Sequence, residues 1–267
     1  MAQFYRDQHV TNLTINEDVL IQLNMVFERR VLNINEDVAA DDNTGQKAFL
    51  TYIIRFDNKG YRLFTLDDLL RYFSQAKEIE RVIFTVETGK SLQTNRLVGT
   101  HLELRLDKRD PNNCYLSVTS DDGDWVDSSF SGVKDIIDKC KNKNGWARSS
   151  WTLLSIQITG IIFGFVLSLW AAVKISPKLA IENSFIISFL FALLIFSNTW
   201  TYLNHKIVSY INSLFPNLKF YRPTKDRIHW LMQAVVAGIV LAVMLYFLGL
   251  LFSYVGEILG GFINNGT

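Results

Sequence analysis

Charged side chains are missing from three long apolar stretches in the C-terminal half of this 267-residue sequence. The stretches cover residues 151–173, 180–203 and 228–252, and Glu182, at the rim of the second, is their single charged residue. Each is close to the ~20 apolar residues that span a hydrocarbon core about 30 Å thick. We therefore predict an integral membrane protein with three crossings. It lacks the ionisable residue deep in the membrane that proton-coupled pumps usually carry.

Cysteine is also scarce. Cys114 and Cys140 are the only two, so the sequence does not encode a disulfide framework. The four histidines are scattered and show no ligand spacing with these cysteines. No grouping of Ser, His and Asp stands out from the background. We expect no metal site, no cofactor and no catalytic residues, and we do not interpret the chain as an enzyme.

Two short motifs resemble known active-site sequences, but each lacks a residue that the chemistry requires. Gly89-Lys90-Ser91 would need a glycine where Phe84 stands to form a phosphate-binding loop, so we interpret it as a solvent-exposed turn. The acidic cluster around Gly123 lacks the closing Glu of a calcium loop. It consists of Asp121, Asp122, Asp124 and Asp127. We expect these acids to stabilise the following helix N-terminus; an enzyme that uses them is the weakest alternative.

Basic residues are unevenly distributed around the apolar stretches, and positively charged loops stay on the cytoplasmic side of a membrane. Four precede the first stretch and five lie between the second and the third: Lys139, Lys141, Lys143 and Arg148, then Lys206, Lys219, Arg222, Lys225 and Arg227. The first loop has two, and none follows Arg227. We therefore predict a cytoplasmic N-terminal domain and a C-terminus on the opposite side of the membrane.

Residues 1–148 form the predicted cytoplasmic domain, and residues 149–267 the predicted transmembrane domain. The first is long enough for one domain with its own core. It carries 20 basic and 23 acidic side chains, a net charge of −3, so an anionic ligand would need a local basic pocket. We predict that Arg55, Arg62 and Arg105, with their strand neighbours, bind such a ligand. The alternative is that they form surface pairs with nearby acids.

Alternation of apolar and polar residues predicts strands in this domain, and helical spacing predicts fewer helices. The expected strands cover residues 20–34, 48–56, 61–64, 81–86, 102–106 and 114–119, the last two paired as a hairpin around the turn 110–113. The expected helices cover 66–75, with Thr65 as N-cap, and 129–143. The fold class is an α+β cytoplasmic domain with a mostly antiparallel sheet, followed by an all-α region of three transmembrane helices.

The second apolar stretch extends beyond the membrane. Neither proline nor glycine occurs between Pro177 and Pro216, and a helix of that length exceeds the thickness of a bilayer. Ile207, Ile211 and Leu214 recur at helical spacing. The segment 204–215 is either a cytoplasmic stem that packs against its counterparts in an oligomer or an interfacial helix that lies flat under the bilayer.

Small residues form one stripe on the third stretch. At steps of three and four, the stripe contains Gly238, Ala242, Leu245, Gly249, Ser253, Gly256 and Gly260. Small side chains let helices approach closely, so a tight helix interface explains the pattern. The sharper interpretation makes these residues pore-lining around a symmetry axis. Leu245 is then the hydrophobic constriction, and Glu257 lies at the outer mouth, where it favours cations.

A cytoplasmic α+β domain of about 150 residues, a basic connector at 139–148 and three crossings that end in a glycine-rich helix make up the chain. This architecture resembles channel-forming membrane effectors of bacterial antiphage defence operons, in particular that of the Hailong system. The resemblance implies a homo-oligomeric, tetrameric ion channel in the bacterial inner membrane, with a periplasmic or extracellular C-terminus. It also implies that the cytoplasmic domain binds an oligodeoxyadenylate made by a partner nucleotidyltransferase, which keeps the pore closed until infection removes it.

From the residues alone, we expect a ligand- or partner-sensing cytoplasmic domain coupled to an oligomeric pore that depolarises the inner membrane. The alternative is a membrane-anchored interaction module. In that case the helices tether the domain to the lipid bilayer and no ion passes.

Overall fold

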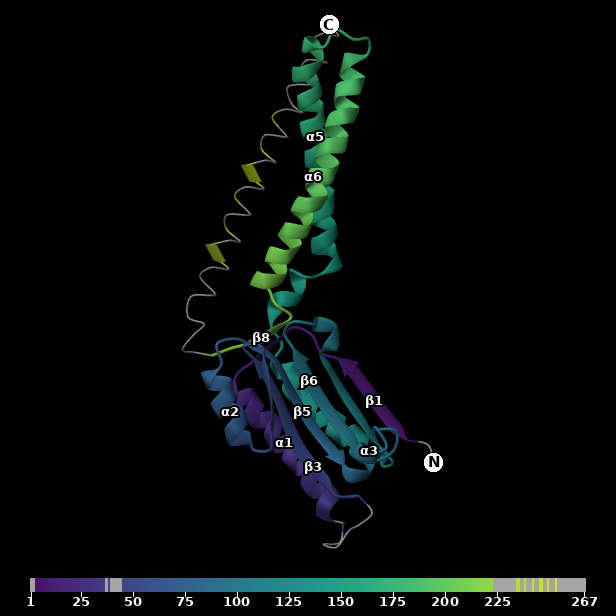
Figure 1. Cartoon of the computed structure of the whole chain (residues 1–267), viewed down its shortest axis with the longest axis vertical. Coiled ribbons are helices and arrows are strands. Elements are labelled where there is room, and N and C mark those ends of the chain that lie inside the picture. Colours follow the sequence, from purple (N-terminus) through teal and green to yellow (C-terminus); the bar gives the residue numbers. More distant parts are fainter. Residues whose placement is uncertain are drawn as a thin grey trace. The chain divides into compact units, whose positions relative to one another are not determined.

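The computed structural model describes residues 3–36, 38, 45–222, 234–235, 238, 242, 245–246, 249 and 253. The chain divides into two compact units, Met1–Tyr221 and Arg222–Thr267. The first unit contains a sheet domain and a hairpin of two long helices, α5 and α6 (Figure 1).

A six-stranded sheet is the centre of the sheet domain, with the strand order β1-β7-β6-β5-β3-β4. Its strands are β1 (Phe4–His9), β3 (Ala48–Phe56), β4 (Lys59–Leu63), β5 (Ile79–Thr88), β6 (His101–Asp107) and β7 (Tyr115–Ser120). All neighbouring strands are antiparallel. The predicted α+β domain with a mostly antiparallel sheet is therefore confirmed.

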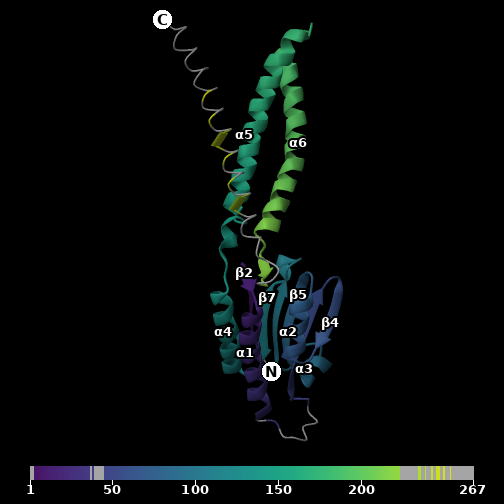
Figure 2. The same cartoon turned by 90° about the vertical axis from the view of Figure 1, so that its left-hand side faces the viewer.

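Three helices pack against one face of this sheet: α1 (Glu17–Glu36), α2 (Leu66–Gln75) and α4 (Gly123–Lys139). Figure 2 shows α1 and α4 next to each other on that face. Phe84 of β5 is fully buried there and contacts Phe27 of α1, with ring centroids 5.3 Å apart. Leu104 and Val118, on the neighbouring strands, share this core. On the opposite face, which we call the open face, the elements that the structure describes leave most of the sheet uncovered; the short helix α3 (Gly89–Gln93) and its following loop meet it at one end.

Local patterns explain where several elements begin. Thr65 caps α2 as predicted, because its hydroxyl oxygen accepts a hydrogen bond from the amide of Asp68 (3.3 Å). The strand predicted for 48–56 is β3, and β6 and β7 form the predicted hairpin. Asp57 and Asn58, with φ angles of 49° and 63°, supply the left-handed conformations that a tight turn between β3 and β4 requires.

Residues 20–34 form part of helix α1, so the strand predicted there was wrong. Leu20, Leu23 and Phe27 are fully buried, and their spacing of three and four residues places them on one helical face. Ile21 and Met25, which completed the alternating pattern, point away from this core and are 38 % and 64 % exposed. The two periodicities share Leu23 and Phe27, which is why the strand pattern was misleading.

Helix α4 begins six residues before the predicted start at 129 and ends at Lys139 instead of 143. Asp122 sets the start, because its carboxylate accepts hydrogen bonds from the amides of Asp124 (2.9 Å) and Trp125 (3.2 Å). Asp122 therefore stabilises the helix N-terminus, as predicted for this acidic cluster, and Asp124 lies in the first turn of the helix.

Helices α5 (Ser150–Ile175) and α6 (Ser184–Leu214), joined through the 3₁₀ turn η3 (Ser176–Lys178), pack against each other as a hairpin. Among the described residues, these two helices are long and apolar enough to span a membrane. The third predicted crossing lies largely outside those residues. Helix α6 continues unbroken to Leu214; its 31 residues measure about 46 Å at 1.5 Å per residue. Ile207 and Ile211 are half-buried.

Small residues of α5 form the contact with α6. Gly160 lies so close to Trp200 that a Cβ atom added at Gly160 would be 1.5 Å from the indole ring. Ser168 and Ala172 are fully buried, and with Gly164 they continue the same face at steps of four. Side chains this small let two helices approach closely in a membrane.

The chain returns from α6 into the sheet domain through a segment that was not predicted. Strand β8 (Leu218–Phe220) pairs in parallel with β2 (Leu13–Ile15). Phe220 is 7 % exposed, and its ring contacts Phe73 of α2 edge-on, with centroids 6.1 Å apart. We call residues 215–221 the return segment. Because both ends of the hairpin meet the sheet domain, the domain and the return segment must share one side of any membrane that the hairpin crosses.

Candidate functional site

The open face of the sheet carries polar side chains in rows, because cross-strand partners point to the same face. The row at one end contains Arg55, Arg81 and Asp107. The adjacent row contains Arg62, Ile53, Ile83, Arg105 and Tyr115, and the row after it Thr51, Thr85, Glu103 and Ser117. Charged groups therefore concentrate on a face that helices leave open.

Four arginines gather at one end of this face. We call Arg55, Arg81, Arg105 and Arg109 the arginine patch. Two of them bind the carboxylate of Glu80, whose side chain is only 3 % exposed: Arg55 Nε lies 2.8 Å from Oε2, and Arg109 Nη2 lies 2.9 Å from Oε1. Glu80 occupies the irregular position where the register between β3 and β5 shifts. The shift brings its carboxylate to the arginines.

Asp107, at the end of β6, holds the other two arginines. Arg81 Nε lies 2.6 Å from its Oδ2, and Arg105 Nη2 lies 4.0 Å from the same oxygen. The side chain of Asp107 is 1 % exposed, whereas Arg81 and Arg105 are 30 % and 23 % exposed. Four guanidinium groups around two carboxylates leave a local surplus of positive charge. Fixed, partly exposed guanidinium groups are suited to bind phosphate or carboxylate ligands.

The predicted ligand residues are only partly brought together. Arg55 and Arg105 both belong to the arginine patch, whereas Ile53 and Ile83 separate Arg62 from Arg105 in their shared row. Arg55 also pairs with an acid, as the alternative had it. The prediction missed Arg81 and Arg109. Arg81 could have been found from the sequence, because it alternates with the core residues of β5 and therefore lies on the open face.

Glu103 is the centre of a second polar cluster on the open face. Its carboxylate accepts hydrogen bonds from Tyr115 Oη and Arg96 Nη1, both at 2.7 Å, and lies 3.5 Å from His101 Nε2. Burial alone would raise the pKa of Glu103. Hydrogen bonds from His101 and Tyr115 and the charge of Arg96 outweigh it and lower this pKa to about 2. Burial, followed by the neighbouring Glu103, raises the pKa of Tyr115.

Arg96 closes one side of this cluster from the loop after α3. It lies 3.6 Å from a carboxylate oxygen of the buried Glu87 as well as binding Glu103. Its φ is 66°, and that of Asn95 is 50°, so two consecutive residues have left-handed backbone that side chains disfavour. The ion pairs stabilise this loop conformation.

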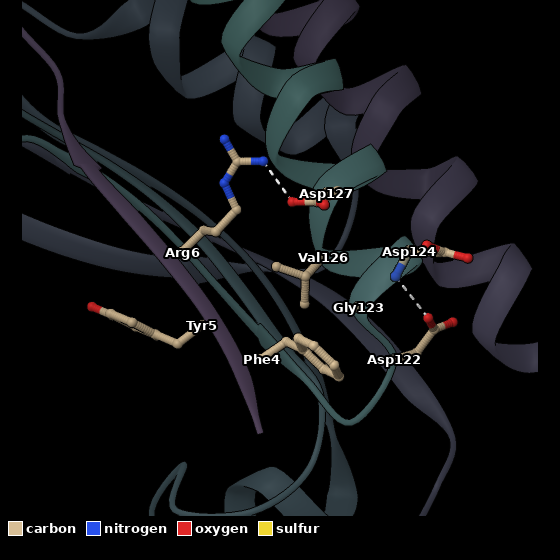
Figure 3. A pocket seen from close by; sticks show the side chains of 8 residues that line it. All are labelled: Phe4, Tyr5, Arg6, Asp122, Gly123, Asp124, Val126 and Asp127. Carbon is tan, nitrogen blue, oxygen red and sulfur yellow. Dashed lines mark hydrogen bonds and ion pairs between the residues drawn. The ribbon is translucent and has the colours of Figure 1, made fainter. Parts of the chain in front are cut away.

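A depression of about 390 Å³ lies where the start of β1 meets the N-terminus of α4 (Figure 3). Asp127 extends towards Arg6, with 2.6 Å between Oδ1 and Nη1, and Asp122 caps the helix. The ring of Phe4 lies against Gly123, where a Cβ atom would be 3.2 Å away. Among the described residues, no group of three or more His, Cys, Asp or Glu side chains is arranged to hold a metal ion. Asp122 and Asp127 have structural partners, the amide of Asp124 and the guanidinium of Arg6.

Gly89-Lys90-Ser91 forms the first turn of α3, so the solvent-exposed turn predicted there was wrong. Thr88 caps the helix by accepting a hydrogen bond from the amide of Ser91 (3.3 Å), and Ser91 is fully buried. Gly89 packs against the backbone of Gly45, because a Cβ atom added at Gly89 would lie 3.3 Å from that backbone. The motif builds a compact corner of the domain.

Five residues of the predicted pore-lining stripe are described, and all are helical and exposed: Gly238, Ala242, Leu245, Gly249 and Ser253. Leu245 is 60 % exposed. The remaining predicted positions, Gly256, Gly260 and Glu257 at the outer mouth, lie outside the described residues.

No family model, curated protein or solved structure matches this chain.

Proposed function

We propose that this protein is an oligomeric membrane channel whose opening is controlled by an anionic ligand bound to its cytoplasmic sheet domain. The observation that carries the proposal is the return segment. A simple anchor needs one flexible connection, whereas here the end of α6 continues directly into a strand of the sheet domain. Motion of the domain is thereby transmitted to the hairpin.

A continuous chain of contacts links the open face to α6. The arginine patch lies on β3, β5 and β6 and on the turn after β6. Strands β3 and β5 pack on α1, and α1 begins two residues after β2 ends at Ile15. Leu13 and Ile15 of β2 pair with Leu218 and Phe220 of β8, which follows α6. A shift of the sheet against α1 therefore moves the inner end of the hairpin.

The ligand class that fits the arginine patch is a phosphodiester. The patch has a local surplus of positive charge in a domain of net charge −3. One guanidinium group can donate two parallel hydrogen bonds to two oxygens of a phosphate. The architectural resemblance favours an oligodeoxyadenylate made by a partner nucleotidyltransferase, a tetrameric assembly and a role in antiphage defence by depolarisation of the inner membrane.

The pore in this proposal is lined by the small-residue stripe with Leu245 as its constriction, because a ring of leucines can keep a narrow passage dry. Replacing Leu245 by Ser would wet the ring. With an oligodeoxyadenylate present to keep the wild-type pore closed, we expect liposomes that contain the Leu245→Ser protein to leak potassium at least tenfold faster than those with the wild-type chain, and Leu245→Ile to behave like wild type.

The measurement is potassium flux from liposomes that hold equal amounts of folded protein. If Leu245→Ser liposomes stay as tight as the wild type, Leu245 does not line a pore. If no flux arises with or without an oligodeoxyadenylate, the membrane-anchored interaction module replaces the channel.

A further inference from the structure

One face of α6 points away from α5 over the whole length of the helix. It contains Ile187, Phe191, Leu194, Asn198, Thr201, His205, Val208 and Asn212, spaced alternately by four and three residues. All are exposed except Val208, which is half-buried, whereas Ser188 and Ala192, on the opposite side, are buried. Alternating steps of four and three keep these residues on one face of the helix, the geometry in which one helix can pack along another. We call these eight residues the α6 seam.

The composition of the α6 seam changes halfway. Its outer part consists of the apolar Ile187, Phe191 and Leu194, and its inner part is polar apart from Val208. Gly160 and Gly164 of α5 lie at the levels of Trp200 and Phe196 of α6, so Asn198 stands level with about residue 162. That is eleven residues above Trp151, or about 16 Å at 1.5 Å per residue.

Trp151 marks the inner membrane boundary in the proposed orientation, because exposed tryptophans favour the headgroup level. It is 78 % exposed. Asn198 then lies deep in the hydrocarbon region, where an unsatisfied amide is costly. The side chains of Asn198 and His205 form no hydrogen bond with any described residue, whereas Thr201 donates to the carbonyl of Ser197 (3.1 Å). Asn198 therefore needs a partner from elsewhere.

The middle of the third apolar stretch, residues 234–245, does not offer that partner, since it contains no Asn, Gln, Ser, Thr, His or Tyr. A second copy of α6 does, because an amide both donates and accepts and so complements itself across a symmetry axis. Interhelical hydrogen bonds between such side chains hold membrane helices together.

We propose that the α6 seam binds the α6 seam of a second copy of this chain, with hydrogen bonds at Asn198 and dry contacts at Phe191 and Leu194. The inference rests on the proposed function, in which α5 and α6 cross the membrane, and it names a surface that joins the subunits in pairs, so that a tetramer is a dimer of dimers. It does not depend on ion conduction.

Cysteine cross-linking in native membranes tests the seam with a matched pair of variants. Thr201 and Thr199 are both exposed, and each hydroxyl donates to the carbonyl four residues earlier. Being two residues apart, they point to nearly opposite sides of the helix. We expect copper-catalysed oxidation to link Thr201→Cys chains into dimers at least fivefold more efficiently than Thr199→Cys chains. The wild-type chain reports any background from Cys114 and Cys140.

Equal dimer yields from the two variants would overturn the seam. A second variant, Asn198→Leu, separates a protein interface from lipid contact. At an interface it should lower the oligomeric fraction in detergent severalfold, whereas on a lipid-facing surface it should leave that fraction unchanged or increase it, which would also overturn the proposal. Cross-linking of Thr201→Cys chains without potassium flux in the liposome assay would contradict the channel proposal but support the α6 seam. Flux without such cross-linking removes only the seam.

Discussion

The open face of the sheet and the helical hairpin satisfy their polar groups in opposite ways. On the open face, buried carboxylates each have arginine partners, as at Glu80 and Asp107. Helices α5 and α6 contain only two charged side chains, Lys174 and Lys206. Four of their hydroxyls donate hydrogen bonds to backbone carbonyls of the same helix, for example from Thr159 to the carbonyl of Ser155 (2.8 Å).

In the proposed topology, the difference follows from the medium around each region, water for the open face and lipid for the hairpin. A buried ion pair at the edge of water recovers part of its desolvation cost from strong hydrogen bonds, whereas in hydrocarbon each polar group must find its partner within the protein. Stability of the hairpin therefore depends on close contact, and stability of the open face on charge. Each of the following substitutions alters one side of this comparison.

The largest effect is expected from Gly160→Ala in the hairpin. The added Cβ would overlap the ring of Trp200 at 1.5 Å, whereas a Cβ at Gly164 would meet its nearest neighbour, in Phe196, at 3.9 Å. We expect Gly160→Ala to destabilise the full chain by about 3 kcal/mol and Gly164→Ala to have little effect. Thermal aggregation in mild detergent measures both. Equal midpoints for the two alanine variants would show that the helices do not meet at Gly160.

On the open face, Glu103→Gln removes one ionised carboxylate without changing its shape. A pKa of about 2 instead of 4.5 corresponds to about 3 kcal/mol at neutral pH, and the amide of Gln retains part of this. We expect a loss of about 2 kcal/mol. The contribution of Glu103 is complete above pH ~4.5 and is lost as the pH falls through ~2, so the difference between variant and wild type should shrink over that interval.

Urea unfolding of the detergent-solubilised full chain, followed by circular dichroism at several pH values, measures this difference. Glu78→Gln is the control. Glu78 pairs with Lys108 at 2.7 Å, but its side chain is 59 % exposed, so its replacement should cost less than ~0.5 kcal/mol. A pH-independent loss at Glu103 would contradict the assigned charge.

Ligand binding should be weakened by Arg105→Glu in the arginine patch. Loss of one guanidinium and gain of a repelling carboxylate should lower affinity for an oligodeoxyadenylate at least tenfold, or about 1.4 kcal/mol. Arg71→Glu is the control, because Arg71 lies on α2 and pairs with Asp68 (2.8 Å). Fluorescence anisotropy with a labelled oligonucleotide gives the affinities. Unchanged binding by Arg105→Glu would remove the patch as the ligand site.

The smallest effect is expected at the cap of α2. Thr65→Ala removes the oxygen that accepts from the amide of Asp68 and should cost about 1 kcal/mol, whereas Thr65→Asp keeps an acceptor and should be nearly neutral. The same urea titration resolves this change. A neutral Thr65→Ala would mean that the cap contributes nothing beyond local geometry.

Sequence reasoning was most reliable where one local pattern decides the structure. The alternation in 48–56 and the hydroxyl of Thr65 identified β3 and α2 to the residue. It failed for α1, where two periodicities share the same residues, and for β1, whose residues FYRDQH are all exposed and show no alternation. Such an edge strand is recognised only from its pairing with β7.

The candidate site was only half accessible to prediction for a related reason. Arg55 and Arg105 were found because each alternates with apolar residues in its own strand. That Arg81 joins them depends on the register between three strands, and the position of Glu80 depends on an irregularity in that register. Strands β2 and β8, of three residues each, carry no pattern long enough to detect.

The return segment also determines the order in which the molecule can be completed. The backbone N–H of Asn12 donates a hydrogen bond to Oδ1 of Asn217, 205 residues later in the chain (2.9 Å). Phe220 fills part of the core beside Phe73. A ribosome that makes this chain has released the rest of the sheet domain long before β8 emerges. Helices α5 and α6 are synthesised before β8, and in the proposed topology they insert into the membrane before β8 can pair with β2. Until β8 is added, part of the core of the sheet domain is therefore incomplete. During that time chaperone binding or proteolysis competes with the last step of folding. In the proposed topology, that step requires a hairpin that has inserted correctly.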